Sequence, residues 1–256
     1  MNTPDIPVAV VTGANRGIGR AITVALAVAG YAVAAGARDP ASLADTVKEA
    51  GEMVVPVACD VCDEGSVATL AERAGQLGPV HVVVANAGIA GPTAPLHEIT
   101  LANWRETIAT DLDGVFLTFR AFIPAMIERR DGSLIAISSM TGKRPLHGRT
   151  PYAAAKMGVI GLVRTLAAEL GPHGVRVNAI CPGAVAGPRI DQVLARQAAA
   201  RGITEEAVRA EMAGLSPLRR LVQAEEVAAA CVYLASGGSA AITGEDLNVT
   251  AGVVMY

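Results

Sequence analysis

Aromatic side chains are scarce in this sequence: tryptophan, tyrosine and phenylalanine together make up 3% of its 256 residues. A chain with so few aromatics has little to stack against nucleic acid bases. Its formal net charge of −3 offers no strongly basic surface to a phosphate backbone or an anionic membrane. We therefore expect neither nucleic acid nor membrane as a partner, and a small molecule becomes the expected ligand.

Long apolar runs are also missing. The most apolar stretch, residues 21–37, is shorter than the ~20 residues that a membrane-spanning helix needs, and Gly30 interrupts it. A helix followed by a strand explains this stretch better. The opening MNTPDIPVAVVTG has no basic segment ahead of a long apolar run, which predicts no signal peptide. We expect a cytoplasmic protein.

Cysteine is rare as well, with four residues in the chain. Cys59 and Cys62 have the CxxC spacing of a metal or redox motif, but no second pair and no nearby histidine completes a zinc site. We therefore expect no metal, and we predict that the two are buried, reduced thiols at the end of a strand.

Short apolar runs that alternate with amphipathic ones are abundant. Continuous apolar strands are typical of a parallel sheet covered on both faces, and their alternation with helices predicts an α/β, doubly wound Rossmann-type fold in a single domain. The predicted strands are 8–12, 32–37, 53–58, 80–85, 133–138, 175–180 and 246–250, and the predicted helices are 17–29, 41–50, 64–76, 101–129, 152–170 and 224–235.

A long insertion before the last helix and strand interrupts this rhythm. Residues 183–216 contain two further helical segments, RIDQVLARQAAA and TEEAVRAEMAG. We expect about 187–215 to cover the site as a lid, because long insertions of this kind often close over ligands.

A glycine-rich turn, TGANRGIGR, links the first predicted strand to the first predicted helix. Glycines at such a turn let the backbone approach a pyrophosphate, while the helix N-terminus presents unpaired N–H groups to its charge. Glycine turns also simply connect strands to helices, but the strand–turn–helix context favours dinucleotide binding. The residues expected to line this part of the site are Gly13, Asn15, Arg16, Gly17, Ile18 and Gly19.

The segment TPYAAAKMGVIG places Tyr152 and Lys156 four residues apart, so both side chains lie on one face of a predicted helix. A free phenol holds its proton too tightly for efficient acid–base chemistry at neutral pH. A cation about 5 Å away favours the phenolate by roughly 3 kcal/mol at an effective dielectric constant of ~20. The pair is therefore a candidate proton-transfer site. A core tyrosine beside a lysine that extends to solvent is the structural alternative.

Together with NAG at 86–88 and Ser139, these motifs make the chain similar to the classical short-chain dehydrogenase/reductase family over essentially its whole length. The resemblance implies a nicotinamide cofactor and hydride transfer to or from a carbonyl carbon. It implies that Tyr152 exchanges a proton with the substrate oxygen, that Ser139 hydrogen-bonds this oxygen and that Lys156 holds the nicotinamide ribose. A serine at a strand end could instead cap a turn, as Ser138 could.

The same resemblance implies further cofactor contacts. It places Asn86, Ala87 and Gly88 along the cofactor, and Asp60 and Val61 at the adenine. A turn or a helix cap after the third strand is an alternative role for Asp60, and both roles are compatible.

Two positions depart from the family pattern. TDLDGVF has Asp111 where the family has an asparagine whose backbone carbonyl holds a water linked to the lysine. Asp111 retains that carbonyl, so we keep it as a catalytic candidate, with a carboxylate expected near Lys156. PGAVAG has Gly187 where a threonine often anchors the nicotinamide amide, and backbone groups around Val185 are the expected substitute.

The choice of cofactor depends on the end of the second predicted strand, where NAD sites usually have a carboxylate. That position is Ala37, followed by Arg38, whereas Asp39 is expected to cap the next helix. Arg16 and Arg38 can flank a 2′-phosphate with their forked donors. NADP(H) is favoured and NAD(H) remains possible, since both arginines could be solvated surface residues.

These inferences predict an NADP(H)-dependent oxidoreductase that acts on a ketone or secondary alcohol, as a 3-oxoacyl reductase or a small-ketone reductase. The alternatives are an NAD-dependent alcohol or diol dehydrogenase of the same family, a non-catalytic NADP sensor and a nucleotide-sugar epimerase. The basic loop GKRPLHGR, 142–149, is expected to be solvated rather than to bind an anionic substrate. The long helical patterns and the family resemblance predict a homotetramer.

Overall fold

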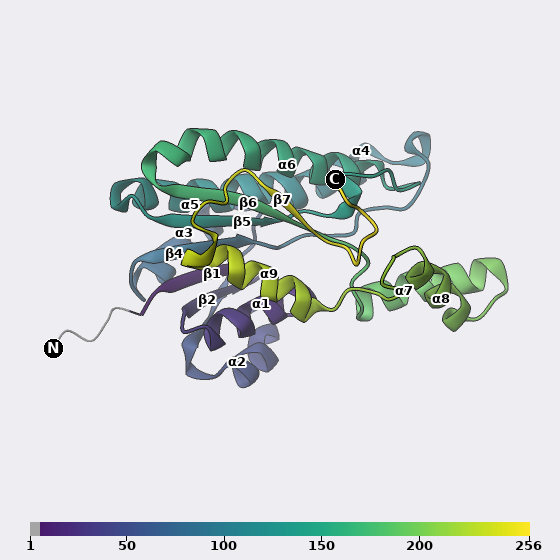
Figure 1. Cartoon of the computed structure of the whole chain (residues 1–256), viewed down its shortest axis with the longest axis horizontal. Helices are drawn as coiled ribbons and strands as arrows, with labels where there is room; N and C mark the ends of the chain where they lie inside the picture. Colours follow the sequence, from purple (N-terminus) through teal and green to yellow (C-terminus); the bar gives the residue numbers. More distant parts are fainter. Residues whose placement is uncertain (1–5) are drawn as a thin grey trace.

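The computed structural model describes residues 6–256, except for the side chains of Arg189, Arg196, Gln197 and Ala200. Strands and helices alternate along the described chain (Figure 1). The strands are β1 (Val8–Thr12), β2 (Ala32–Ala37), β3 (Val54–Ala58), β4 (Val80–Ala85), β5 (Gly132–Ile137), β6 (Val175–Pro182) and β7 (Asp246–Val249). The α-helices are α1 (Gly17–Val28), α2 (Ala44–Ala50), α3 (Glu64–Gly75), α4 (Leu101–Ile108), α5 (Gly114–Arg129), α6 (Thr150–Leu170), α7 (Pro188–Arg201), α8 (Glu205–Gly214) and α9 (Ala224–Ala235).

The strands form one parallel sheet in the order β3-β2-β1-β4-β5-β6-β7, which confirms the predicted doubly wound fold. The chain reverses its direction of winding between β1 and β4. In open α/β sheets the ligand binds at this switch point, beyond the carboxyl ends of the strands.

Both faces of the sheet are covered by helices. In β1, Val8 and Val10 pack into a core shared with α3, α5 and α6, whereas Ala9 and Val11 pack into a second core shared with α1 and α9. Successive strand residues point to opposite faces, so a strand buried on both sides must be apolar throughout. This requirement explains the continuous apolar runs of the sequence.

The predicted helix 101–129 is wrong in one respect. A π-helical turn, Ala109–Asp113, separates α4 from α5. Such turns hold an extra residue in the helical path and are frequent at functional sites. Helical periodicity alone does not reveal one, because the residues on both sides remain helical. The turn contains Asp111.

The insertion forms the two predicted helices, α7 and α8, which stand beside the main body after β6 (Figure 1). Leu194, Ala198 and Val208 form a small core between them, with Met212 packed against it. The hairpin thus has its own apolar contacts.

The apolar stretch 21–37 is divided between α1 and β2, as predicted. Among the residues that the structure describes, no helix is long and apolar enough to cross a membrane.

Candidate active site at the carboxyl edge of the sheet

The predicted motifs meet at the edge of the sheet where β1, β4 and β5 end. Thr12, the last residue of β1, joins two of them: its Oγ1 accepts hydrogen bonds from the backbone N–H groups of Asn86 and Ala87, both at 3.1 Å. Asn86 in turn donates through Nδ2 to the carbonyls of Thr12 (2.8 Å) and Gly13 (3.1 Å). Sequence reasoning missed Thr12. A threonine that ends a buried strand before a glycine turn was its available signal.

Two glycines of the turn, Gly13 and Gly19, pack closely against these groups. A β-carbon on Gly19 would lie 2.1 Å from the Gly13 carbonyl oxygen and 2.4 Å from Asn86 Nδ2. Gly13 has φ +65°, a conformation that glycine adopts without strain. Gly17 (φ +53°), at the start of α1, has open space where its β-carbon would lie.

The N-terminus of α1 suits an anion. No side chain caps this helix, and no acidic residue lies in its first turn. Its first N–H groups and the positive end of its dipole are therefore available to a phosphate. The open space at Gly17 lets a phosphate approach the peptide backbone. These residues therefore fit a dinucleotide cofactor.

Tyr152 and Lys156 lie one turn apart on α6. Lys156 Nζ is 5.7 Å from the centre of the Tyr152 ring and donates a hydrogen bond to the Ile137 carbonyl at 3.0 Å. Lys156 is 3% exposed, whereas Tyr152 is half-buried. This burial contradicts the alternative of a lysine that extends to solvent.

Ser139 lies just beyond β5 and is 8% exposed. Its Oγ accepts a hydrogen bond from the N–H of Thr141 at 3.1 Å, so Ser139 caps a short 3-10 turn. The cap uses a lone pair and leaves the hydroxyl hydrogen free to be donated. Our alternative of a capping role for Ser138 is wrong: its hydroxyl donates to the Lys156 carbonyl at 2.8 Å and ties β5 to α6.

Asp111 is fully buried, and its Oδ1 accepts a hydrogen bond from the N–H of Ile89 at 2.7 Å. A β-carbon on Gly88 would lie 2.9 Å from this Oδ1 and 3.5 Å from Lys156 Nζ. Gly88 therefore stands between the carboxylate and the ammonium. The structure places the Asp111 side chain near Lys156, as the sequence suggested.

The residues predicted at the adenine end follow β2 and β3. Asp60 accepts a hydrogen bond through Oδ1 from the N–H of Cys62 at 3.0 Å, which confirms a turn role, while Val61 is buried against Gly114. Asp39 accepts from the N–H of Ala41 at 3.0 Å and caps the next helical turn, as predicted. Arg16 and Arg38 are both exposed.

The segment after β6 is fixed by a parallel bridge between Val185 and Val222. Gly187 follows as the residue that precedes α7, with φ +133°. A threonine would be strained in this conformation. The departure at Gly187 therefore agrees with its local backbone.

The cysteine prediction is half wrong, since Cys59 is buried but Cys62 is exposed. Burial raises the pKa of Cys59 to about 11 and that of Cys231 to about 12. Among the described residues, no group of three or more histidine, cysteine, aspartate or glutamate side chains is placed to hold a metal ion.

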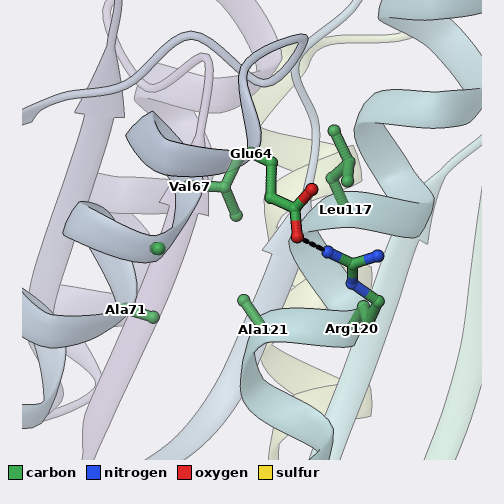
Figure 2. Close-up of a pocket in the computed structure, with 7 residues that line it drawn as sticks. Glu64, Val67, Ala71, Leu117, Arg120 and Ala121 are labelled. Carbon is green, nitrogen blue, oxygen red and sulfur yellow. Dashed lines mark hydrogen bonds and ion pairs between the residues drawn. The ribbon is translucent and has the colours of Figure 1, made fainter.

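A hollow of about 250 Å³ lies elsewhere, between α3 and α5 (Figure 2). It is lined mostly by alanine, valine and leucine side chains, and the Glu64–Arg120 ion pair crosses it. None of the residues discussed above as cofactor or catalytic candidates lines it. This hollow is therefore separate from the candidate active site.

A doubly wound sheet with an uncapped helix after a glycine turn, and a serine, tyrosine and lysine at its carboxyl edge, defines a nicotinamide-dependent oxidoreductase. The family model described as enoyl-(acyl carrier protein) reductase matches residues 13–254. The chain belongs to the short-chain dehydrogenase/reductase family. As an enzyme of this family, it interconverts ketones and secondary alcohols with a nicotinamide dinucleotide.

Individual relatives cover nearly the whole chain. The cis-4-hydroxycyclohexanecarboxylate dehydrogenase of Sinomonas cyclohexanicum is 40% identical over 96% of this chain and 95% of its own. The acetoacetyl-CoA reductase of Rhizobium meliloti is 37% identical over 96% of this chain and 97% of its own. A solved structure of an actinorhodin polyketide ketoreductase variant with NADPH has a TM-score of 0.94, at 35% identity, with both chains covered completely.

Proposed function

We propose that this protein is an NADPH-dependent reductase of 3-oxoacyl thioesters. The observation that carries the proposal is the likeness, through the lid helices and to the end of the chain, to a polyketide ketoreductase with NADPH. Acetoacetyl-CoA, named in a second relative, is itself a 3-oxoacyl thioester. Ala37 at the end of β2, followed by the exposed Arg38, supports NADPH over NADH, because the cation can pair with a 2′-phosphate where a carboxylate would repel it.

Three of the candidate residues have direct roles in this reaction. The bound nicotinamide supplies the hydride that reaches the ketone carbon. Ser139 donates its hydroxyl hydrogen to the ketone oxygen and so orients the ketone. The Thr141 N–H binds a lone pair of Ser139 Oγ and holds this hydroxyl in place. Tyr152 gives its proton to the same oxygen as the hydride arrives. Lys156 stabilises the resulting phenolate and holds the nicotinamide ribose.

The cofactor contacts extend from these groups to the glycine turn. The residues from Gly13 to Gly19 would hold the pyrophosphate at the α1 N-terminus, and Asn86, Ala87 and Gly88 would line the nicotinamide half. Asp60 and Val61 would contact the adenine, and Val185 would hold the amide through its backbone. The α7–α8 hairpin acts as the lid.

The test is a screen of NADPH oxidation with purified enzyme. We expect acetoacetyl-CoA and longer 3-oxoacyl thioesters to be reduced with kcat/KM at least about tenfold above cyclic ketones. Tyr152→Phe is the matched inactive control. A preference for 4-oxocyclohexanecarboxylate would instead favour a dehydrogenase of cyclic secondary alcohols, which the 40% identity to such an enzyme makes the second candidate. Cofactor binding without turnover on any substrate would indicate that the protein is a non-catalytic NADP sensor.

Assembly as a homotetramer belongs to the same proposal. Phe116 on α5 and Met157 on α6 are 45% and 54% exposed, and a neighbouring subunit would cover these apolar side chains. Sedimentation at micromolar concentration checks this, and a monomer would contradict it.

A cytoplasmic location also stays a proposal, supported by the use of NADPH and by free thiols, and cell fractionation tests it.

A further inference from the structure

Arg149 contacts two parts of the candidate active site at once. It precedes α6, three residues before Tyr152, and its guanidinium carbon lies 4.9 Å from the centre of the Tyr152 ring. Its Nη2 donates a hydrogen bond to the carbonyl of Ala90, in the loop that follows β4. Arg149 is half-buried, so this member of the basic loop 142–149 is not simply solvated.

The loop that Arg149 contacts also binds Asp111. The N–H of Ile89 donates to Asp111, and the carbonyl of the next residue, Ala90, accepts from Arg149. A carboxyl group and a guanidinium thus hold neighbouring peptide groups of one loop, each by a hydrogen bond. The loop continues along the cofactor residues Asn86–Gly88, and the N–H of Ala94 donates to the carbonyl of Gly148 at 3.0 Å, which joins it to the segment before α6.

The ring of Tyr152 faces two cations from its own helix and its cap. Arg149 is 4.9 Å from the ring centre and Lys156 is 5.7 Å from it. Asp111 lies near Lys156, with Gly88 in contact range of both side chains, and Ser139 from the β5 end is neutral. A guanidinium attracts the face of an aromatic ring, and more strongly when the ring is a phenolate.

We propose that Arg149 is a positioning residue for proton transfer, which fixes the Tyr152 ring against the 88–94 loop and favours its phenolate. The inference rests on the proposed role of Tyr152. In this proposal Arg149 acts on the reaction through Tyr152. Lys156 alone was the cation that the sequence offered for this purpose, and the Arg149 guanidinium is a second.

The test compares Arg149→Gln with Arg149→Lys, through the pH profile of kcat/KM for alcohol oxidation. We expect Arg149→Gln to move the rising limb of the profile, which follows loss of the Tyr152 proton, to higher pH by about 0.5 to 1 unit and to lower kcat by about tenfold, with cofactor Kd changed less than about threefold. Arg149→Lys retains the charge, so the rising limb of its pH profile should stay near that of the wild type while kcat falls by a smaller factor. Arg144→Gln removes the same charge from the same loop and should leave both the profile and kcat unchanged.

Two results would overturn the inference. Equal loss of kcat in the Gln and Lys variants with no movement of the pH profile would make Arg149 a structural link only. A rise in KM confined to anionic substrates, again without movement of the profile, would make it a substrate-binding residue. The Tyr152→Phe variant separates the two proposals: if it remains active, the proposed function fails, whereas an inactive Phe variant with an unshifted Arg149→Gln profile removes this inference alone.

Discussion

Lys156 Nζ lies 5.7 Å from the centre of the Tyr152 ring and is held there by the carbonyl of Ile137. The four-residue spacing on α6 puts both side chains on one helix face, and burial of Lys156 weakens the screening of its charge by water. The contact to Ile137 ties the ammonium to the strand whose end carries Ser139. This contact links Tyr152 and Lys156 on α6 to the end of β5, where we propose that the substrate carbonyl reacts.

We first predict that Tyr152→Phe abolishes turnover. The variant retains the ring and its contacts with Arg149 and Lys156 but has no proton to give. NADPH binding, measured by fluorescence, should stay within about threefold of the wild type, because only the proton donor is lost. A variant that keeps more than about a tenth of the wild-type rate would show that Tyr152 is not the proton donor.

The second prediction concerns cofactor choice. Wild type should prefer NADP(H) in kcat/KM, and Ala37→Asp should shift the preference towards NAD(H) by about tenfold or more, because a carboxylate at the end of β2 binds ribose hydroxyls and repels a 2′-phosphate. Arg38→Gln is the matched control. It should weaken the binding of NADPH and leave the binding of NADH unchanged. Equal use of both cofactors by the wild type would contradict the Arg16 and Arg38 assignment.

The third prediction concerns Asp111. An ionised Asp111 carboxylate would compensate part of the Lys156 charge, so Asp111→Asn should then leave Tyr152 facing a stronger net cation and favour its phenolate. The rising limb of kcat/KM for alcohol oxidation, which follows loss of the Tyr152 proton, should move to lower pH by up to about 1 unit, opposite to Arg149→Gln. The asparagine oxygen can still accept from the Ile89 N–H, so the loop should be retained. An upward shift or complete inactivity would contradict this charge coupling, and no shift would leave only the backbone role.

The fourth prediction concerns the contribution of the Lys143–Asp246 ion pair to stability. Lys143 forms an ion pair with Asp246 in which the two side chains are only 8% and 10% exposed, and its Nζ donates to the Tyr256 carbonyl at 2.9 Å. Lys143→Met should lower the free energy of unfolding by about 3 kcal/mol, because Asp246 would lose a buried partner. Arg164 also pairs with Asp246 but is 63% exposed, so Arg164→Met should cost about 1 kcal/mol or less.

Urea unfolding of the two variants measures the difference. Equal effects would show that burial of Lys143 does not set the strength of this pair.

The fifth prediction is that thiol reagents modify Cys62 alone in the native protein. Cys62 is exposed, whereas Cys59, Cys181 and Cys231 are buried. Partial desolvation raises the pKa of Cys62, so its rate of labelling should keep increasing with pH beyond pH 9 rather than level off there. Burial raises the pKa of Cys231 to about 12, so it stays a protonated thiol across this range.

Mass spectrometry after timed alkylation identifies the labelled residue. Modification of Cys59 at a rate similar to Cys62 would contradict the burial of the first CxxC thiol.

Some features of this protein follow from the sequence by itself. The parallel sheet was predictable because strands covered on both faces must be apolar at every position, as in β1 and β4. The glycine turn and the Tyr152–Lys156 pair were predictable because they depend on spacing within one segment. The helices α7 and α8 were predictable for the same reason, since helical periodicity is a local property.

Contacts between segments were decided only by the tertiary structure. Thr12 joins two motifs more than seventy residues apart, and Arg149 reaches Ala90 across the site, and neither contact leaves a periodic signal in the chain. The π-helical turn that contains Asp111 also escaped, because one extra residue in a helical path does not interrupt the pattern around it. Local patterns thus determined the elements and the reacting pair, whereas the environment of Tyr152 depends on charges that folding brings together from distant parts of the chain.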